Sequence, residues 1–281
     1  MKRKLIDFLF VVATGFCALL ALVILGSVVH FILSQGSLYL YHQLFSPHTA
    51  SISLDRQRLI AMGVSTSMIV GTTLLIIFPF ALATSIYLNE YAKDNWFVSV
   101  MRFCIGTLSG IPSIVYGLFG MMVFVRMLHL GMSIIAGSLT LSLMLFPLLM
   151  KQIEQALKQV PMLYREASIA LGTTSLETVK NVVIPTARPG IMVGLLLVIG
   201  RIIGESAALL FTVGSFVRLP VGDTGILSIF EAGTTLTIRA FIEVKEYGHV
   251  EVAAAIGIVI MVLVLMLNIS TKLMVWLFSG D

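Results

Sequence analysis

Two ionisable residues, Arg201 and Glu205, stand inside a long apolar stretch at residues 190–215. An arginine at the centre of a membrane helix costs about 2.5–3.5 kcal/mol on insertion scales, so such a residue rarely faces lipid. In a continuous helix, residues four apart lie on one face and can pair. That spacing predicts an Arg201–Glu205 pair on one helical face, and Thr212 continues the same face.

Two interpretations of this charge pair remain open from the residues alone. In the first, Arg201 and Glu205 neutralise each other or a neighbouring helix and only hold the helices together. In the second, Arg201 lines a water-filled path and attracts an anion, while Glu205 sets its position. A guanidinium group offers a fork of donors that suits a tetrahedral oxyanion. An ionisable group inside a membrane segment is a functional hypothesis by default.

The second chemical feature is a polar segment, REASIALGTTSLETVKNVVIPTARP, at residues 165–189. Pro161 suits the first turn of a helix, and Gly172 suits the left-handed cap that ends one. Thr174–Glu177 has the pattern of a capping box that opens a second helix. We expect this second helix to end before Pro185. The pattern predicts two short helices around a tight turn, able to dock on a soluble partner; an ordinary inter-helix loop is the alternative.

The rest of the chain predicts an all-α integral membrane protein. It is 58% hydrophobic and 11% charged over 281 residues, with mean hydropathy +1.03, whereas a soluble domain has about a quarter charged residues. The basic N-terminus leads into an apolar run too long for a signal peptide, which we interpret as an uncleaved first helix. We expect residues 1–281 to form a single transmembrane domain. Six apolar windows are long enough to span a bilayer: roughly 8–33, 64–88, 103–125, 132–150, 190–215 and 252–277.

The distribution of charge indicates orientation rather than a nucleic-acid partner. The segments predicted to be cytoplasmic hold more Lys and Arg than the outer ones, which places both termini in the cytoplasm. This bias explains the net charge of +4. The five histidines and two cysteines have no metal-ligand spacing, so we expect no metal site. The sequence also has no GxxxxGK[ST] motif, so this chain cannot bind ATP in the usual P-loop manner.

Small residues predict where helices approach closely. Gly190 and Gly194, Gly200 and Gly204, and Gly106 and Gly110 form small-xxx-small pairs. Each pair can pack within the chain or against another subunit, and packing within the chain is the simpler interpretation.

Three segments resemble permeases of ABC importers. Glu166-Ala167-Ser168, with Gly172 six residues after Glu166, is similar to the EAA loop of these permeases, although Ser168 replaces an alanine. Residues 108–120, LSGIPSIVYGLFG, and residues 201–212, RIIGESAALLFT, resemble the third- and fifth-helix signatures of PstA-type permeases of the phosphate-specific transporter. The similarity covers roughly residues 60–278.

The resemblance implies a type I ABC-importer permease (MetI-like) fold with six transmembrane helices. It implies a heterodimer with a PstC-type permease over a dimer of PstB-type ATPases, and a PstS-type protein that delivers phosphate. ATP and Mg²⁺ are then bound by the ATPase, and this chain is a non-catalytic subunit of the bacterial inner membrane. Arg201 and Glu205 match the family's charged positions on the phosphate path. Glu166, Ala167 and Gly172, with Ser168, match the ATPase-docking loop within residues 161–184.

Two departures from the family pattern leave alternatives open. Ala208 stands where these permeases usually have proline, and residues 215–220 replace a threonine- and proline-rich run. A permease for sulfate, molybdate or an amino acid is therefore the nearest alternative. An ion-driven secondary transporter would show inverted repeats, which we do not find in the sequence. A membrane sensor of phosphate is a third class and could coexist with transport.

Overall fold

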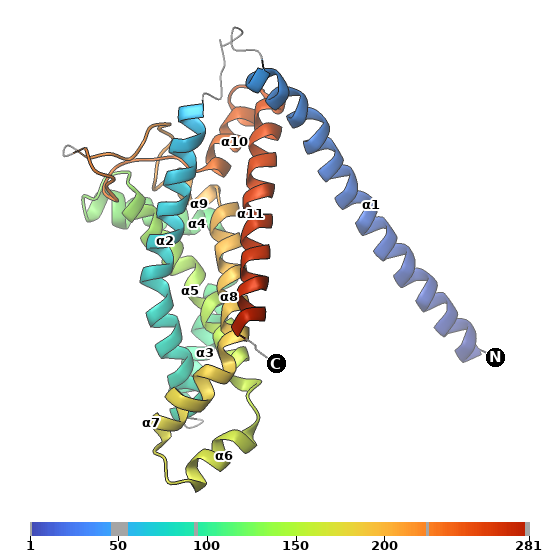
Figure 1. Cartoon of the computed structure of the whole chain (residues 1–281), viewed down its shortest axis with the longest axis vertical. Coiled ribbons are helices and arrows are strands. Elements are labelled where there is room, and N and C mark those ends of the chain that lie inside the picture. The colour runs from blue at the N-terminus through green and yellow to red at the C-terminus, as the bar shows by residue number, and fades with distance from the viewer. Residues whose placement is uncertain (1, 46–55, 93–94, 223–224, 279–281) are drawn as a thin grey trace. The chain divides into compact units, whose positions relative to one another are not determined.

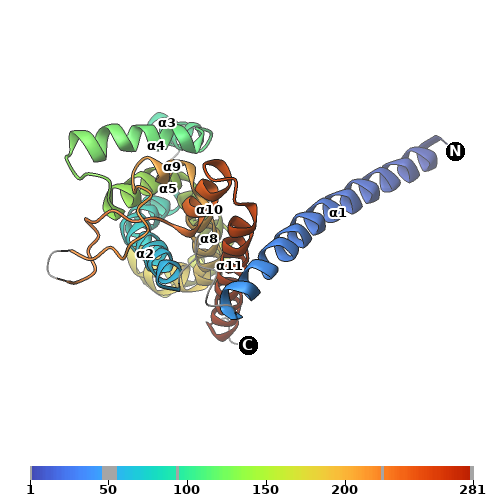
Figure 2. The same ribbon diagram turned by 90° about the horizontal axis from the view of Figure 1, so that it is seen from above.

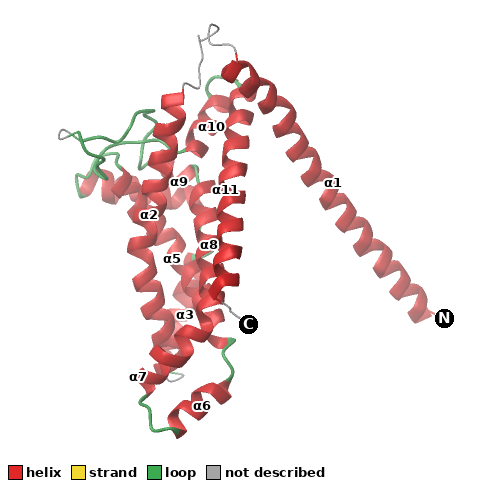
Figure 3. Cartoon of the chain, in the orientation of Figure 1, coloured by secondary structure: helices red, strands yellow, loops and turns green. Residues whose placement is uncertain are grey.

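The computed structural model describes residues 2–45, 56–92, 95–222 and 225–278, and the regular structure in these ranges is helical (Figure 1, Figure 3). Within these described ranges, five helices are long and apolar enough to cross a membrane, and a sixth crossing is possible if one bent pair counts as a span. These findings confirm the predicted all-α membrane architecture.

The helices and helical turns follow in chain order: α1 (Lys2–Phe45), α2 (Arg56–Ile86), η1 (Tyr87–Tyr91), α3 (Trp96–Leu108), α4 (Ser113–Gly120), η2 (Met121–Met127), α5 (Ile134–Lys158), α6 (Met162–Ala170), α7 (Ser175–Thr178), η3 (Val179–Val183), α8 (Ile184–Gly204), α9 (Ala207–Leu210), α10 (Leu236–Lys245) and α11 (Val250–Phe278). The elements labelled η are π-helical turns continuous with a neighbouring α-helix.

The chain divides into two compact units. The first contains residues 1–54 and 240–261, and the second contains residues 55–239 and 262–281. In the first unit, α1 and the start of α11 approach closely at Gly36, where an added Cβ would lie 2.7 Å from the backbone of Ala254. Most of the apolar side chains of α1 are exposed, as expected for a helix surrounded by lipid.

The core of the second unit is α5, which packs against α2, α4, α8 and α9 (Figure 2). Ser133 caps its first turn by accepting a hydrogen bond from the Ala136 N–H. The α8 helix approaches α5 at Gly190 and Gly194, where an added Cβ would meet Ala156 and Gln152. The first predicted glycine pair therefore packs within the chain.

The predicted span at residues 103–125 is not one straight helix. Its two parts, Trp96–Leu108 and Ser113–Met127, are bent by 97° at a short break. Pro112 lacks an N–H and disfavours helical geometry in the residue before it, which accounts for the break. The bend brings α4 against α9 and leaves Ser109 and Ser113 on the two sides of the break.

The contact between α4 and α9 gives a stability prediction. A Cβ added at Gly117 would lie 2.8 Å from Cα of Ala208, a backbone atom that cannot rotate away. We expect Gly117→Ala to destabilise the chain by about 1–3 kcal/mol, the usual cost of overpacking. Gly71→Ala is the matched control, because nothing lies within 4 Å of its added Cβ. Thermal unfolding of the purified protein in detergent should show a lower Tm for Gly117→Ala alone.

Candidate functional site

The predicted common face of Arg201 and Glu205 is wrong, because the helix between them ends. The α8 helix stops at Gly204, and Glu205 takes an extended conformation with φ −81° and ψ 125°. The chain then resumes as the short α9 helix. Arg201 therefore lies in the last turn of one helix and Glu205 lies in the break after it, and the structure records no ion pair between them within its described residues.

Arg201 lines a cavity of about 240 Å³ in the second unit. The other polar side chains of the lining belong to Ser109, Ser113 and Tyr116, at the break between α3 and α4. The apolar part of the lining comes from leucine and methionine side chains of α5 and from Leu108 and Ile111. Arg201 is exposed, and among the described residues it has no hydrogen bond or ion pair that would neutralise it. An unpaired guanidinium beside hydroxyl groups in a small cavity is suited to bind an anion.

Glu205 and Thr212 lie outside the lining of the Arg201 cavity. The Glu205 side chain is buried, and its Oε1 accepts a hydrogen bond from the Ala208 N–H at 3.3 Å, which caps α9. Its carbonyl accepts a hydrogen bond from the Thr237 hydroxyl at 3.2 Å. Thr212 is fully buried next to Gly120, and its hydroxyl donates to the Ala208 carbonyl at 3.1 Å. Neither side chain lines the Arg201 cavity.

The loop at residues 161–184 has most of the predicted local structure. Pro161 precedes α6, Gly172 turns the chain with φ +87°, and α7 begins with a complete capping box. In that box, the Glu177 carboxylate accepts a hydrogen bond from the Thr174 N–H at 2.8 Å, and the Thr174 hydroxyl accepts from the Glu177 N–H at 3.3 Å. The positive φ explains why glycine suits position 172.

One part of that prediction is wrong: the second helix does not end before Pro185. It continues from Ser175 to Gly204 as one helical segment. The wider π-helical turn η3 precedes the proline, and Pro185 then falls in the first turn of α8. Because the helical segment is continuous, Pro185 interrupts one backbone hydrogen bond, and the wider π-helical turn before it accommodates this interruption.

A hydroxyl cluster closes the turn between α6 and α7, and the sequence analysis did not anticipate it. The Ser168 hydroxyl lies 2.7 Å from that of Thr173 and 3.0 Å from that of Thr178. The Thr173 hydroxyl also donates to the Ser168 carbonyl at 2.8 Å. Ser168, which replaces the second alanine of the EAA pattern, thus ties α6 to α7. A serine at a position where the EAA pattern has alanine was the one sequence feature that could have indicated this cluster.

Arg165 attaches the loop to the rest of the second unit. Its guanidinium makes a bidentate ion pair with Glu90 of η1, with N–O distances of 3.1 and 2.9 Å. It also donates to the carbonyls of Leu157 and Val160 at the end of α5, at 2.9 and 2.7 Å. The Leu157 carbonyl also accepts a hydrogen bond from the Val160 N–H at 3.3 Å, and Val160 lies two residues beyond the end of α5. One side chain, 13% exposed, therefore joins α6 to the ends of α2 and α5.

The outward surface of this loop is apolar. Glu166 and Ala167 are exposed. Around them the loop exposes six large apolar side chains: Met162, Leu163, Tyr164, Ile169, Leu171 and Leu176. A cluster of exposed apolar residues on a rigid helical hairpin is typical of a protein-docking surface.

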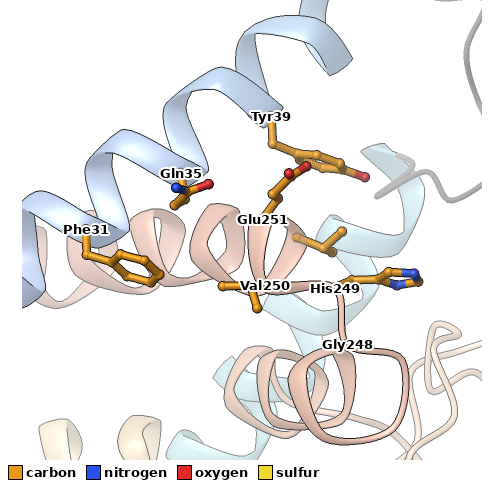
Figure 4. Close-up of a pocket in the computed structure, with 8 residues that line it drawn as sticks. Phe31, Gln35, Tyr39, Gly248, His249, Val250 and Glu251 are labelled. Carbon is orange, nitrogen blue, oxygen red and sulfur yellow. The ribbon is translucent and has the colours of Figure 1, made fainter.

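A second pocket, in the first unit, has a different chemistry. It measures about 530 Å³ and is lined by residues of α1, by Gly248 and His249, and by the start of α11 (Figure 4). Its polar side chains include Gln35, Tyr39, His249 and Glu251. Nδ1 of His249 lies 3.0 Å from Oε2 of the buried Glu243. These carboxylates disfavour an anion, so the Arg201 cavity is the better candidate for an anion site.

Within the part of the chain that the structure describes, no three His, Cys, Asp or Glu side chains gather closely enough to hold a metal ion.

Comparison with solved structures identifies the fold. The chain is similar to a chain of the MetNI methionine ABC transporter in an inward-facing conformation, with TM-score 0.61, 16% identity, and coverage of 79% of this chain and 98% of that chain. It is also similar to a chain of a bacterial ABC transporter that imports alginate, with TM-score 0.58, 15% identity, and coverage of 90% and 95%. These identities support the fold and not the substrate.

Proteins of similar sequence are also permeases of ABC transporters or phosphate transport systems. A probable ABC transporter permease, YqgI of Bacillus subtilis, is 35% identical over 267 residues, which cover 92% of this chain and 89% of the relative. A PstA homolog of the phosphate transport system in Mycoplasma pneumoniae is 32% identical over 80% of this chain. PstA 2 of Mycobacterium bovis is 40% identical over 58% of this chain. The matched parts span 34% and 51% of these two relatives.

The model of one protein family, described as binding-protein-dependent transport system inner membrane component, matches residues 77–276. The match includes the loop at 161–184 and the helices that form the Arg201 cavity. The helical fold, the sequence relatives and the family match all indicate a membrane subunit of an ABC transporter. The chain belongs to the family of binding-protein-dependent inner membrane components, the non-catalytic permease subunits of ABC importers.

Proposed function

We propose that this permease carries inorganic phosphate into the cytoplasm, driven by ATP that a separate subunit hydrolyses. The observation that carries the substrate assignment is Arg201, an unpaired cation in a cavity that also exposes serine hydroxyls. The names of the PstA relatives support it. The cavity, at about 240 Å³, is smaller than the roughly 300–1,000 Å³ typical of drug-sized ligands, and so favours a small ion.

As a permease of this family, the chain works with an ATPase and a solute-binding protein. Our finer proposal is a PstC-type permease as the second membrane subunit, a dimer of PstB-type ATPases, and a PstS-type phosphate-binding protein. ATP and Mg²⁺ are held by the ATPase. Both termini and the loop at 161–184 lie in the cytoplasm, which agrees with the excess of basic residues in those segments.

The loop transmits force in this proposal. The exposed Glu166, the apolar side chains around it and the rigid turn at Gly172 form the surface that docks on the ATPase. Arg165 then passes the movement to α2 and α5 through Glu90 and the carbonyls at the end of α5. Because α5 also forms a wall of the Arg201 cavity, ATP binding can change access to that cavity. Glu205 and Thr212 fix the shape of the helix break beside it.

Uptake of labelled phosphate and sulfate by cells that lack this protein, with and without the wild-type gene, tests the function. We expect the gene to restore phosphate uptake alone, and ATP depletion to abolish it. Restored sulfate uptake would favour the alternative of another oxyanion permease. Uptake that persists after ATP depletion would indicate a secondary transporter. Unchanged uptake with an altered phosphate-responsive promoter would indicate a sensor.

A further inference from the structure

A second cation lies next to the Arg201 cavity. Lys151, in α5, donates a hydrogen bond from Nζ to the hydroxyl of Ser109 at 3.2 Å. Ser109 is itself part of the cavity lining, at the break between α3 and α4. Along α5, Lys151 follows the cavity residues Met144, Leu145 and Leu148 in the direction of the loop at 161–184.

Three basic residues near this end of α5 are neutralised by carboxylates, whereas Lys151 is not. Lys158 and Arg102 both pair with Glu154, at 2.7 and 3.1 Å, and Arg165 pairs with Glu90. Lys151 has only the neutral Ser109 hydroxyl as a recorded partner within the described residues. An ionised side chain in a membrane segment without a counter-charge marks a place that an ion visits.

We propose that Lys151 and Ser109 form a second anion-binding position, on the side of the Arg201 cavity nearer to the coupling loop. The inference rests on the proposed function for the direction of movement and names the residues that receive the oxyanion after Arg201. A lysine ammonium is a compact charge with three rotatable donors, which can bind an oxyanion without holding it in one geometry. Conduction needs binding weak enough, or shared among sites, to let the ion leave. A lysine that binds the anion after Arg201 on its path would share the binding between two positions and let the anion leave.

The competing explanation is that Lys151 only extends its ammonium group toward the membrane surface, as lysines near helix ends do. The two explanations predict different results for substitutions at Ser109. A lysine that only reaches the surface does not need this hydroxyl. A shared anion position does, because the Ser109 hydroxyl, which donates to the Gly106 carbonyl at 2.6 Å in this structure, can turn its one proton toward the anion while Lys151 neutralises it.

The test measures phosphate uptake and stimulation of ATP hydrolysis by loaded binding protein, for the complete transporter. We expect Lys151→Met to lower the maximal uptake rate about tenfold, which is the loss of one charge-assisted hydrogen bond, while stimulated ATP hydrolysis persists. Ser109→Ala should lower uptake by about threefold on the same scale. Lys151→Arg should retain most of it. Lys158→Met is the control, because that lysine has its own carboxylate partner.

Uptake by Lys151→Met equal to that of wild type, or lowered no more than in Lys158→Met, would overturn the inference. Joint loss of uptake and stimulated ATP hydrolysis would also count against it, since that pattern indicates a damaged fold. If wild type moves sulfate rather than phosphate, the proposed substrate is wrong, and the same variants are compared with sulfate. Selective loss with Lys151→Met would then still support the position. A wild-type protein that moves no anion would refute both proposals.

Discussion

Arg201→Ala is expected to lower phosphate uptake by about 100-fold without loss of the protein from the membrane. Arg201 contributes the unpaired charge in the cavity lining. Hydrogen bonds to charged groups contribute about 1.5–3 kcal/mol each, so loss of two of them corresponds to at least about two orders of magnitude. The other side chains of the lining are apolar or carry a neutral hydroxyl, and Lys151 lies outside the lining against Ser109, so no other lining side chain replaces the lost guanidinium.

Two further variants test whether the loss of uptake is specific to the guanidinium group at position 201. Arg201→Lys keeps the charge and loses the fork of donors, so it should restore part of the uptake. Arg188→Ala removes an exposed arginine from the other end of α8 and should leave uptake near the wild-type rate. Membrane levels of all variants are measured by immunoblot. Normal uptake by Arg201→Ala would show that the anion does not depend on this residue.

Arg165→Ala is expected to separate ATP hydrolysis from transport. The substitution removes the ion pair to Glu90 and both hydrogen bonds to the end of α5. Removal of one partner of a buried ion pair costs about 3–5 kcal/mol. The loop keeps its own capping box and hydroxyl cluster, so it can still dock on the ATPase. We expect basal ATP hydrolysis to remain and uptake to fall about tenfold or more.

The uncompensated Glu90 carboxylate could instead unfold this region, and a double variant distinguishes the two effects. Arg165→Met with Glu90→Gln removes both charges and relieves the buried carboxylate. Its Tm should recover toward the wild-type value while uptake stays low, because the connection between the loop and α5 is still absent. Recovery of uptake together with Tm would contradict a coupling role for Arg165.

Features set by neighbouring residues could be predicted from the sequence. The helix before Gly172, the left-handed glycine and the Thr174–Glu177 capping box each depend on a few adjacent side chains, and the structure contains all three. Six apolar windows were also sufficient to identify a helical membrane protein, because lipid requires each segment to satisfy its own backbone.

Features set by distant residues could not be predicted. Hydropathy does not distinguish a continuous helix from one that breaks at Glu205, since the residues on both sides are apolar. The Arg165–Glu90 pair joins residues far apart in the chain and has no sequence pattern. Pro185 was assigned to a helix end by a local rule, although the wider turn at Val179–Val183 lets the helix continue. The roles of Arg201, Glu205, Thr212 and the EAA residues stay predictions.

Reconstitution tests the central claim most directly. The purified transporter, with its ATPase and binding protein, is placed in lipid vesicles, and accumulation of labelled phosphate is followed with and without ATP. We predict ATP-dependent accumulation of phosphate that excess unlabelled phosphate abolishes and excess sulfate does not. Accumulation of phosphate without ATP, or ATP-dependent accumulation of sulfate in place of phosphate, would contradict the account.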